Sequence, residues 1–239
     1  MIQKRFIISV LGSALGLFAA GLSLRYYYKQ GALSFAHPMK APRSGEIRVA
    51  CVGDSITYGY GVKPWPEASY PAQLGALLGK NYCVNNFGYS GRTAAGHGDL
   101  PYTREKLFQK SLGLHPDIVI LMLGTNDTKP INWKGAEAFC ESLRRIIRAY
   151  QDLPENPTIL LVTPPPAFSF DFGIDGGRLK HEIRQSMKTA AEAENTSFLD
   201  LFPILDGHPE WFFDGIHPNA DGAKVIAETV FHCIKEMKT

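Results

Sequence analysis

The sequence is poor in cysteine, and its cysteines show no metal-binding pattern. None of the four forms a CxxC pair or stands beside a pair of histidines, which argues against a zinc site and against a thiol redox motif. Two stand in apolar strand-like runs and two in helical patterns, so we expect small buried apolar residues. A disulfide is possible outside the cytoplasm, but the sequence does not show which cysteines would pair. The four are Cys51, Cys83, Cys140 and Cys233.

The sequence also lacks the glycine motifs that cradle phosphates. Neither a P-loop nor a GxGxxG turn follows the first apolar strand of the domain, so no nucleotide cofactor is expected there. The GxSxG motif of the common α/β-hydrolases is missing at the same place. Charge of one sign is scarce too, because the formal net charge is +2 and the basic residues are scattered among acids. A nucleic-acid partner is therefore not expected.

Long hydrophobic runs are absent except for one at the N-terminus. Residues 6–24 carry no charge and follow Lys4 and Arg5. As a helix this run is about 28 Å long, close to a bilayer core of about 30 Å. A membrane anchor is favoured over a cleaved signal peptide, which small residues near position 21 would also allow, and over a buried helix. Both an anchor and a signal peptide predict that the N-terminus engages a membrane or the export machinery. Both also predict that the protein is exported to the periplasm or the extracellular space.

The remaining chain predicts one folded domain. We expect residues 1–30 to be the signal or anchor, 31–45 a linker rich in Pro and Gly, and 46–239 the catalytic domain. In that domain short apolar runs alternate with amphipathic stretches, which is typical of an α/β fold with a parallel sheet covered on both faces. The expected strands lie near 47–52, 82–87, 117–123, 158–163 and 197–200, and the expected helices near 69–79, 102–112, 134–150, 176–194 and 219–236.

Ligands of such sheets bind beyond the carboxyl ends of the strands, and polar residues gather in those segments. Ser55 follows the first strand in "GDSITYG" and is either a nucleophile or a helix cap. Asp214 and His217 in "DGIH" have a spacing that lets the carboxylate orient the imidazole toward a serine, although Asp214 is also a plausible turn residue. Asn126 in "GTND" is either an oxyanion donor or part of an Asx-turn, and Gly88 either a backbone donor or a simple turn.

Together these four segments resemble the sequence blocks of the SGNH hydrolases, also called GDSL esterases and lipases. The resemblance covers residues 47 to about 236 and implies a flavodoxin-like α/β/α sandwich with a five-stranded parallel sheet. It implies that Ser55 is the nucleophile, His217 the general base and Asp214 its orienting acid. The N–H groups of Ser55 and Gly88 and the side chain of Asn126 would form the oxyanion hole. Neither a metal nor an organic cofactor is implied.

The resemblance thus predicts a serine esterase that acts on a small-molecule or carbohydrate ester. O-acetyl groups on carbohydrate are the first expectation, because aromatic and polar residues alternate in the surrounding loops and the chain resembles exported bacterial acetylesterases. A lysophospholipase or thioesterase activity, an acyltransferase, and a non-hydrolytic glycan-binding protein are the alternatives. The aromatic loop residues are Trp65, Tyr102, Phe168, Phe170, Phe172 and Trp211, and the polar ones include Arg92, Asp99 and Lys129. The oligomeric state is not predicted.

Overall fold

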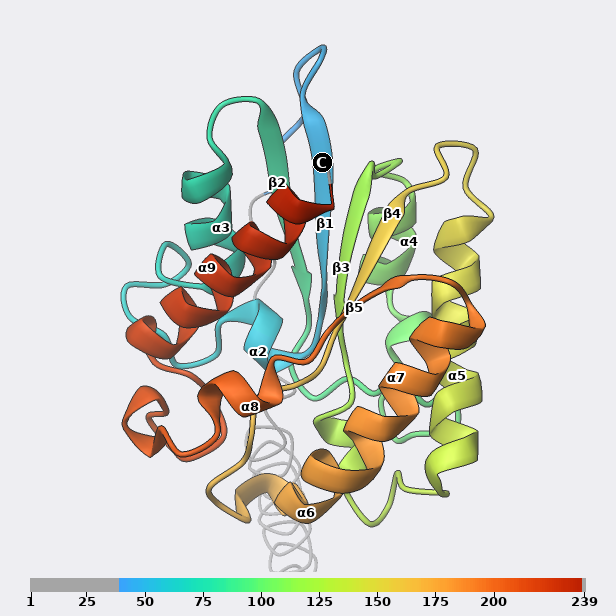
Figure 1. Ribbon diagram of the computed structural model, residues 1–239, viewed down its shortest axis with the longest axis vertical. Coiled ribbons are helices and arrows are strands. Elements are labelled where there is room, and N and C mark those ends of the chain that lie inside the picture. The colour runs from blue at the N-terminus through green and yellow to red at the C-terminus, as the bar shows by residue number, and fades with distance from the viewer. Residues whose placement is uncertain (1–38, 238–239) are drawn as a thin grey trace, which may run out of the picture.

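The computed structural model describes residues 39–237 and contains one five-stranded parallel sheet (Figure 1). The strand order is β2-β1-β3-β4-β5, and every neighbouring pair is parallel. The structure therefore confirms the α/β/α sandwich and the five-stranded parallel sheet that the family resemblance implies. The strands are β1 (Ile47–Gly53), β2 (Tyr82–Gly88), β3 (Ile118–Met122), β4 (Thr158–Val162) and β5 (Ser197–Leu199).

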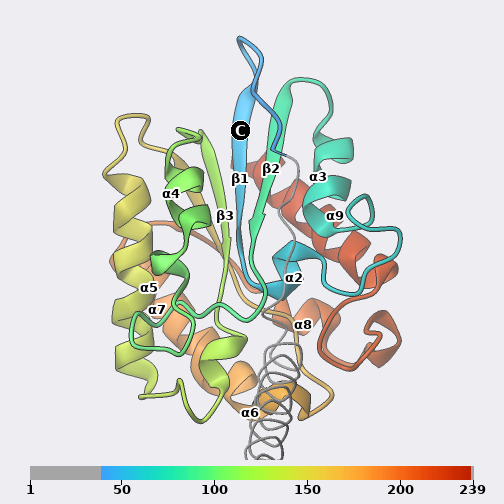
Figure 2. The ribbon, with the colours of Figure 1, turned by 180° about the vertical axis from the view of Figure 1, so that it is seen from behind.

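Helices cover both faces of the sheet, which makes three layers (Figures 1 and 2). Alternate residues of each strand point to opposite faces, so Val49 and Cys51 of β1 belong to one apolar core while Ala50 and Val52 belong to the other. The first core packs against α3 (Tyr70–Leu78) and α9 (Ala220–Glu236). The second packs against α4 (Lys106–Leu112), α5 (Ala136–Gln151) and α7 (Arg184–Ala193). Burial on both faces explains the continuous apolar runs of the central strands.

Two of the expected helices are interrupted. The helix expected near 102–112 is divided at Glu105, whose backbone is extended. The 3₁₀ turn before Glu105 is held to β2 instead, because the buried Tyr102 hydroxyl donates a hydrogen bond to the carbonyl of Phe87. The helix expected near 176–194 contains a π-helical turn. The short elements are α2 (Ser55–Tyr58), η1 (Tyr102–Arg104), η2 (Asn126–Thr128), η3 (Asp171–Gly173), α6 (Gly176–Arg178), η4 (Leu179–Ile183), α8 (Phe202–Leu205) and η5 (Pro209–Trp211).

The predicted signal or anchor over residues 1–30 lies outside the described residues, so it stays a prediction. Within residues 39–237 no helix is both long and apolar enough to cross a bilayer. The end of the predicted linker contacts the domain, because the side chain of Asn85 accepts from the Lys40 N–H at 2.7 Å and donates to the Lys40 carbonyl at 3.0 Å. All four cysteines fall in the described part of the chain, and all are free thiols.

Candidate active site

Ser55 is the first residue of α2 and lies directly beyond the carboxyl end of β1. The cap of this helix is its neighbour Asp54, whose side chain accepts a hydrogen bond from the Ile56 N–H at 3.0 Å. The hydroxyl of Ser55 is thus not used as a helix cap. It lies 2.9 Å from Nε2 of His217, a residue 162 positions later in the chain, and both side chains are buried.

Asp214 holds the imidazole of His217 from its other side. Its Oδ2 lies 2.7 Å from His217 Nδ1, and its Oδ1 accepts from the N–H groups of Ile216 at 3.0 Å and of His217 at 2.7 Å. Gly215 between them has a φ of 80°, which a side chain would disfavour. Burial alone would raise the pKa of Asp214, but the hydrogen bonds and the charge of His217 and the two N–H groups lower it below its ordinary value. Asp214 is both a turn residue and the partner of His217.

Asn126 begins η2 beyond the carboxyl end of β3, next to Asp54. Its Nδ2 donates to Asp54 Oδ2 at 3.3 Å and to the carbonyl of Arg92 at 3.2 Å. Both contacts lie at the long end of the range for N–H···O bonds. The backbone carbonyl of Asn126 accepts from Asn132 Nδ2 at 2.9 Å. The turn that carries this amide is therefore held in place.

Gly88 ends β2 and packs against the backbone of α2. A Cβ at this position would lie 2.1 Å from the nitrogen of Tyr58 and 2.6 Å from the carbonyl carbon of Thr57. Asn86 joins the same two elements, since it donates to the Thr57 carbonyl at 2.8 Å. The N–H of Gly88, which the family resemblance assigns to the oxyanion hole, is directed at Asn86 Oδ1 at 2.8 Å.

Replacing Gly88 with Ala is expected to separate β2 from the helix that carries Ser55. Overpacking of this kind costs about 1–3 kcal/mol, and here the clash is with backbone atoms that cannot rotate away. We expect a lower melting temperature together with a loss of esterase activity. Gly75→Ala is the matched control, because its Cβ would make an ordinary 3.5 Å contact with Val84. If both variants melt like the parent protein, this packing role of Gly88 is wrong.

Two carboxyl groups are fully buried beside the site. Burial raises the pKa of Asp54 to about 6 and that of Asp127 to about 7. The carboxyl of Asp127 accepts from the N–H groups of Ala94 at 3.0 Å and Ala95 at 2.8 Å. Asp127 thereby holds the loop after β2 against η2.

These raised pKa values predict that the protein loses stability as the pH rises from about 4 to about 7. The unfolded chain releases both protons near pH 4, whereas the folded chain holds that of Asp54 up to about pH 6 and that of Asp127 up to about pH 7. Within its own window each carboxyl lowers the free energy of unfolding by up to about 1.4 kcal/mol per pH unit. Urea unfolding at several pH values measures the slope. Asp127→Asn should flatten it, and an unchanged slope in that variant would contradict the assignment.

Three aromatic rings surround the imidazole of His217. The ring centroids of Tyr60, Phe172 and Phe213 lie 4.7, 5.6 and 5.9 Å from that of His217. Of the aromatic loop residues expected at the site, Phe172 is thus confirmed next to His217. Tyr60 and Phe213 were not among them, although each stands within five residues of a catalytic candidate in the sequence.

Other aromatic and polar loop residues have structural contacts. Tyr102 is fully buried, Trp65 donates to the Tyr58 carbonyl at 3.2 Å, and the Trp211 ring stacks on His208 at 3.9 Å. Arg92 is also buried and bonds Glu105 at 2.7 Å. Asp99 accepts from Asn132. These contacts support the loops.

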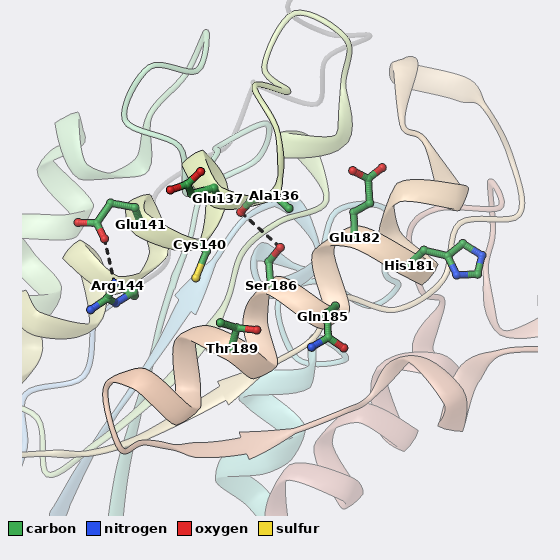
Figure 3. Close-up of a pocket in the computed structure, with 10 residues that line it drawn as sticks. All are labelled: Ala136, Glu137, Cys140, Glu141, Arg144, His181, Glu182, Gln185, Ser186 and Thr189. Atoms are coloured by element: carbon green, nitrogen blue, oxygen red, sulfur yellow. Dashed lines mark hydrogen bonds and ion pairs between the residues drawn. The ribbon is translucent and has the colours of Figure 1, made fainter.

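A groove away from Ser55 lies between α5 and the helical segment of η4 and α7 (Figure 3). Its empty volume, which includes the open space at its mouth, is about 1000 Å³. Cys140 and His181 both line it, but their side chains point in different directions, and burial raises the pKa of the Cys140 thiol. The groove thus shows no activated nucleophile. Across residues 39–237 no group of three or more His, Cys, Asp or Glu side chains is placed to hold a metal ion.

Comparison with known proteins agrees with this geometry. Residues 51–225 match the GDSL-like lipase/acylhydrolase family. The chain is 38% identical over 213 residues to an acetylxylan esterase of Xylanibacter ruminicola, with 82% of this chain and 44% of that protein covered. It is 26% identical over 257 residues to a multidomain esterase of Ruminococcus flavefaciens, with 92% and 31% covered. The chain thus spans less than half the length of either relative.

A solved structure has the same fold. A carbohydrate acetylesterase family member from Sinorhizobium meliloti superposes with a TM-score of 0.68 at 26% identity, covering 80% of this chain and 98% of that one. The family match extends from β1, directly beyond which Ser55 lies, into α9, which follows His217. With the fold, the four sequence blocks and this match in agreement, the chain belongs to the GDSL-like lipase/acylhydrolase family.

Proposed function

We propose that the protein is a serine esterase that hydrolyses carboxylic esters through an acyl-enzyme on Ser55. The observation that carries the proposal is the continuous chain of hydrogen bonds from Ser55 Oγ through His217 to Asp214, at 2.9 and 2.7 Å. Nucleophile, base and orienting acid are the three groups that acyl transfer requires. The lowered pKa of Asp214 keeps its carboxylate charged when the imidazole takes up a proton.

The residues support a two-step reaction. His217 Nε2 takes the hydroxyl proton while Ser55 Oγ bonds to the ester carbonyl carbon, and the tetrahedral intermediate collapses as His217 returns that proton to the leaving alcohol. Water then attacks the acyl-enzyme with the same base, which releases the carboxylic acid and restores Ser55. Asp214 stabilises the imidazolium in both steps.

The developing oxyanion is proposed to bind the Asn126 amide and the N–H of Ser55. Gly91 is a better candidate than Gly88 for a second backbone donor, because the Gly88 N–H already bonds Asn86. Gly91 has a φ of 82° and precedes Arg92, whose carbonyl lies 3.2 Å from Asn126 Nδ2. That contact places this turn beside the amide of Asn126. Donors fixed before the reaction lower the barrier without reorganisation.

The substrate is proposed to be an acetyl ester of a carbohydrate. The relatives named above include an acetylxylan esterase and a carbohydrate acetylesterase family member. A long acyl chain would require an extended apolar channel.

Release of acids from a series of esters tests this proposal. Acetyl, butyryl, octanoyl and palmitoyl esters of one alcohol, together with acetylated xylo-oligosaccharides and a lysophospholipid, are compared by kcat/KM. We expect a steep preference for acetyl and turnover of the acetylated sugars. Preference for the long chains would favour a lipase instead. Glycan binding without any ester turnover, and without labelling of Ser55 by a fluorophosphonate, would overturn the enzyme assignment.

A further inference from the structure

The position of His217 defines where the alcohol half of the ester lies. In the proposed reaction Nε2 returns its proton to the leaving alcohol oxygen, so that oxygen comes within hydrogen-bond distance of Nε2. The carbonyl oxygen of the ester, by contrast, faces the Asn126 amide in the proposed reaction. Side chains that surround the imidazole therefore contact the alcohol and not the acyl group. This reasoning rests on the proposed function.

The side chains around the imidazole are aromatic and come from three separate loops. Tyr60 follows α2, Phe172 lies in η3 between β4 and α6, and Phe213 precedes the turn at Asp214. Phe213 is nearly parallel to the imidazole, at 22°, whereas Phe172 meets it edge-on at 83°. Tyr60 and Phe213 also contact each other at 6.2 Å. Phe213 remains 48% exposed, so part of this wall is open to a ligand.

Backbone features fix two of these rings in place. Gly61 has a φ of 77°, and a Cβ there would lie 2.1 Å from Cζ of Phe213, so the missing side chain makes room for the ring. The Phe213 N–H also donates to the His217 carbonyl at 3.1 Å. Phe172 has a φ of 60°, a left-handed conformation that is costly for a bulky residue and gathers at functional sites.

We propose that Tyr60, Phe172 and Phe213 form the alcohol subsite of the enzyme and that its occupant is the ring of a neutral sugar. The apolar C–H face of a sugar ring packs on a flat aromatic ring while its hydroxyl groups stay in water, which suits a half-exposed wall. A lipid alcohol would gain more from an enclosed channel, which an exposed Phe213 does not provide. The flat aromatic faces next to His217 select the sugar.

Two acetyl esters that differ only in the alcohol test this subsite. Acetylated xylobiose carries a sugar ring, and methyl acetate has an alcohol too small to reach the aromatic wall. Both form the same acetyl-enzyme, so deacylation is common to them. Phe213→Leu and Phe172→Leu keep apolar bulk but remove the flat face. We expect each to lower kcat/KM for the sugar ester about five- to tenfold, with methyl acetate changed less than about twofold.

Matched variants separate a contact with the sugar from other effects. Phe170→Leu changes the same residue type in the same loop, at a side chain that is 86% exposed, and should leave both substrates unchanged. Phe172→Tyr keeps a flat ring and should retain sugar turnover, while thermal melting of every variant checks folding. An equal loss on methyl acetate would show that the rings act only through His217 and would overturn the subsite.

The remaining outcomes also decide the matter. A parent enzyme that hydrolyses methyl acetate but not the sugar ester would overturn the sugar subsite while leaving the esterase proposal intact. If the parent protein hydrolyses neither methyl acetate nor the sugar ester, the proposed function is wrong, and the subsite with it. If phenyl acetate loses more than the sugar ester in Phe213→Leu, the wall selects an aryl alcohol instead.

Discussion

Replacing Ser55 with Ala is expected to lower kcat/KM for acetyl esters by at least about four orders of magnitude. The variant loses the hydroxyl oxygen that lies 2.9 Å from His217 Nε2 and that the proposed reaction acylates, and removing a triad nucleophile elsewhere costs about six orders of magnitude in kcat. Ser55 is not the cap of α2, since Asp54 has that role. Melting behaviour should therefore change little. The measurement is initial-rate hydrolysis of p-nitrophenyl acetate by the purified protein.

A double variant adds an internal control. Ser55 and His217 act as one unit, so Ser55→Ala combined with His217→Ala should be no less active than Ser55→Ala alone. If the activity losses of the two single variants multiply in the double variant, the two residues contribute independently and the hydrogen bond between them is not part of the reaction. Turnover by Ser55→Ala equal to that of the parent protein would remove Ser55 as the nucleophile.

Asn126→Ala should reduce kcat by about two to three orders of magnitude, the usual cost of removing one side-chain donor from an oxyanion hole. The oxyanion exists only in the transition state and the intermediate, so KM should change far less than kcat. Steady-state kinetics on p-nitrophenyl acetate separates the two constants. A rise in KM at an unchanged kcat would contradict the role of Asn126.

Asn132→Ala is a suitable comparison for this variant. Asn132 touches the Asn126 carbonyl at 2.9 Å and Asp99 at 3.0 Å, so its loss loosens the turn but leaves the Asn126 amide present. We expect a loss of less than about tenfold in kcat. An equal loss in both variants would indicate that the Asn126 effect comes from the shape of η2 and not from its amide.

Periodicity in the sequence was enough to predict the layers of this fold. Each of the five strands lies within a residue or two of its expected range, because a strand buried on both faces needs a continuous apolar run with no polar interruption. The breaks in two helices were not predicted. The first break accompanies a hydrogen bond from the Tyr102 hydroxyl to the Phe87 carbonyl. The local sequence pattern does not show a contact with a residue 15 positions away.

The residue types of the site were also readable in the sequence, because the strand-end rule brings Ser55, Asn126 and His217 to one edge of the sheet. Their roles among neighbours were not. Asp54, not Ser55, caps α2, and the Gly88 N–H bonds Asn86. Both of these hydrogen bonds join residues two positions apart, and they depend on local backbone angles that the residue types alone do not show.

The sequence alone thus determined the sheet, its functional edge and the types of group that gather there, since burial and strand direction follow from local composition. Only the tertiary structure decided which donor meets which acceptor and which rings enclose His217. Tyr60, Phe172 and Phe213 come from loops up to 153 positions apart, and their meeting depends on how those loops pack. The physical reason is that a residue's type limits what it can bind, whereas its partners are set by the packing of the whole domain.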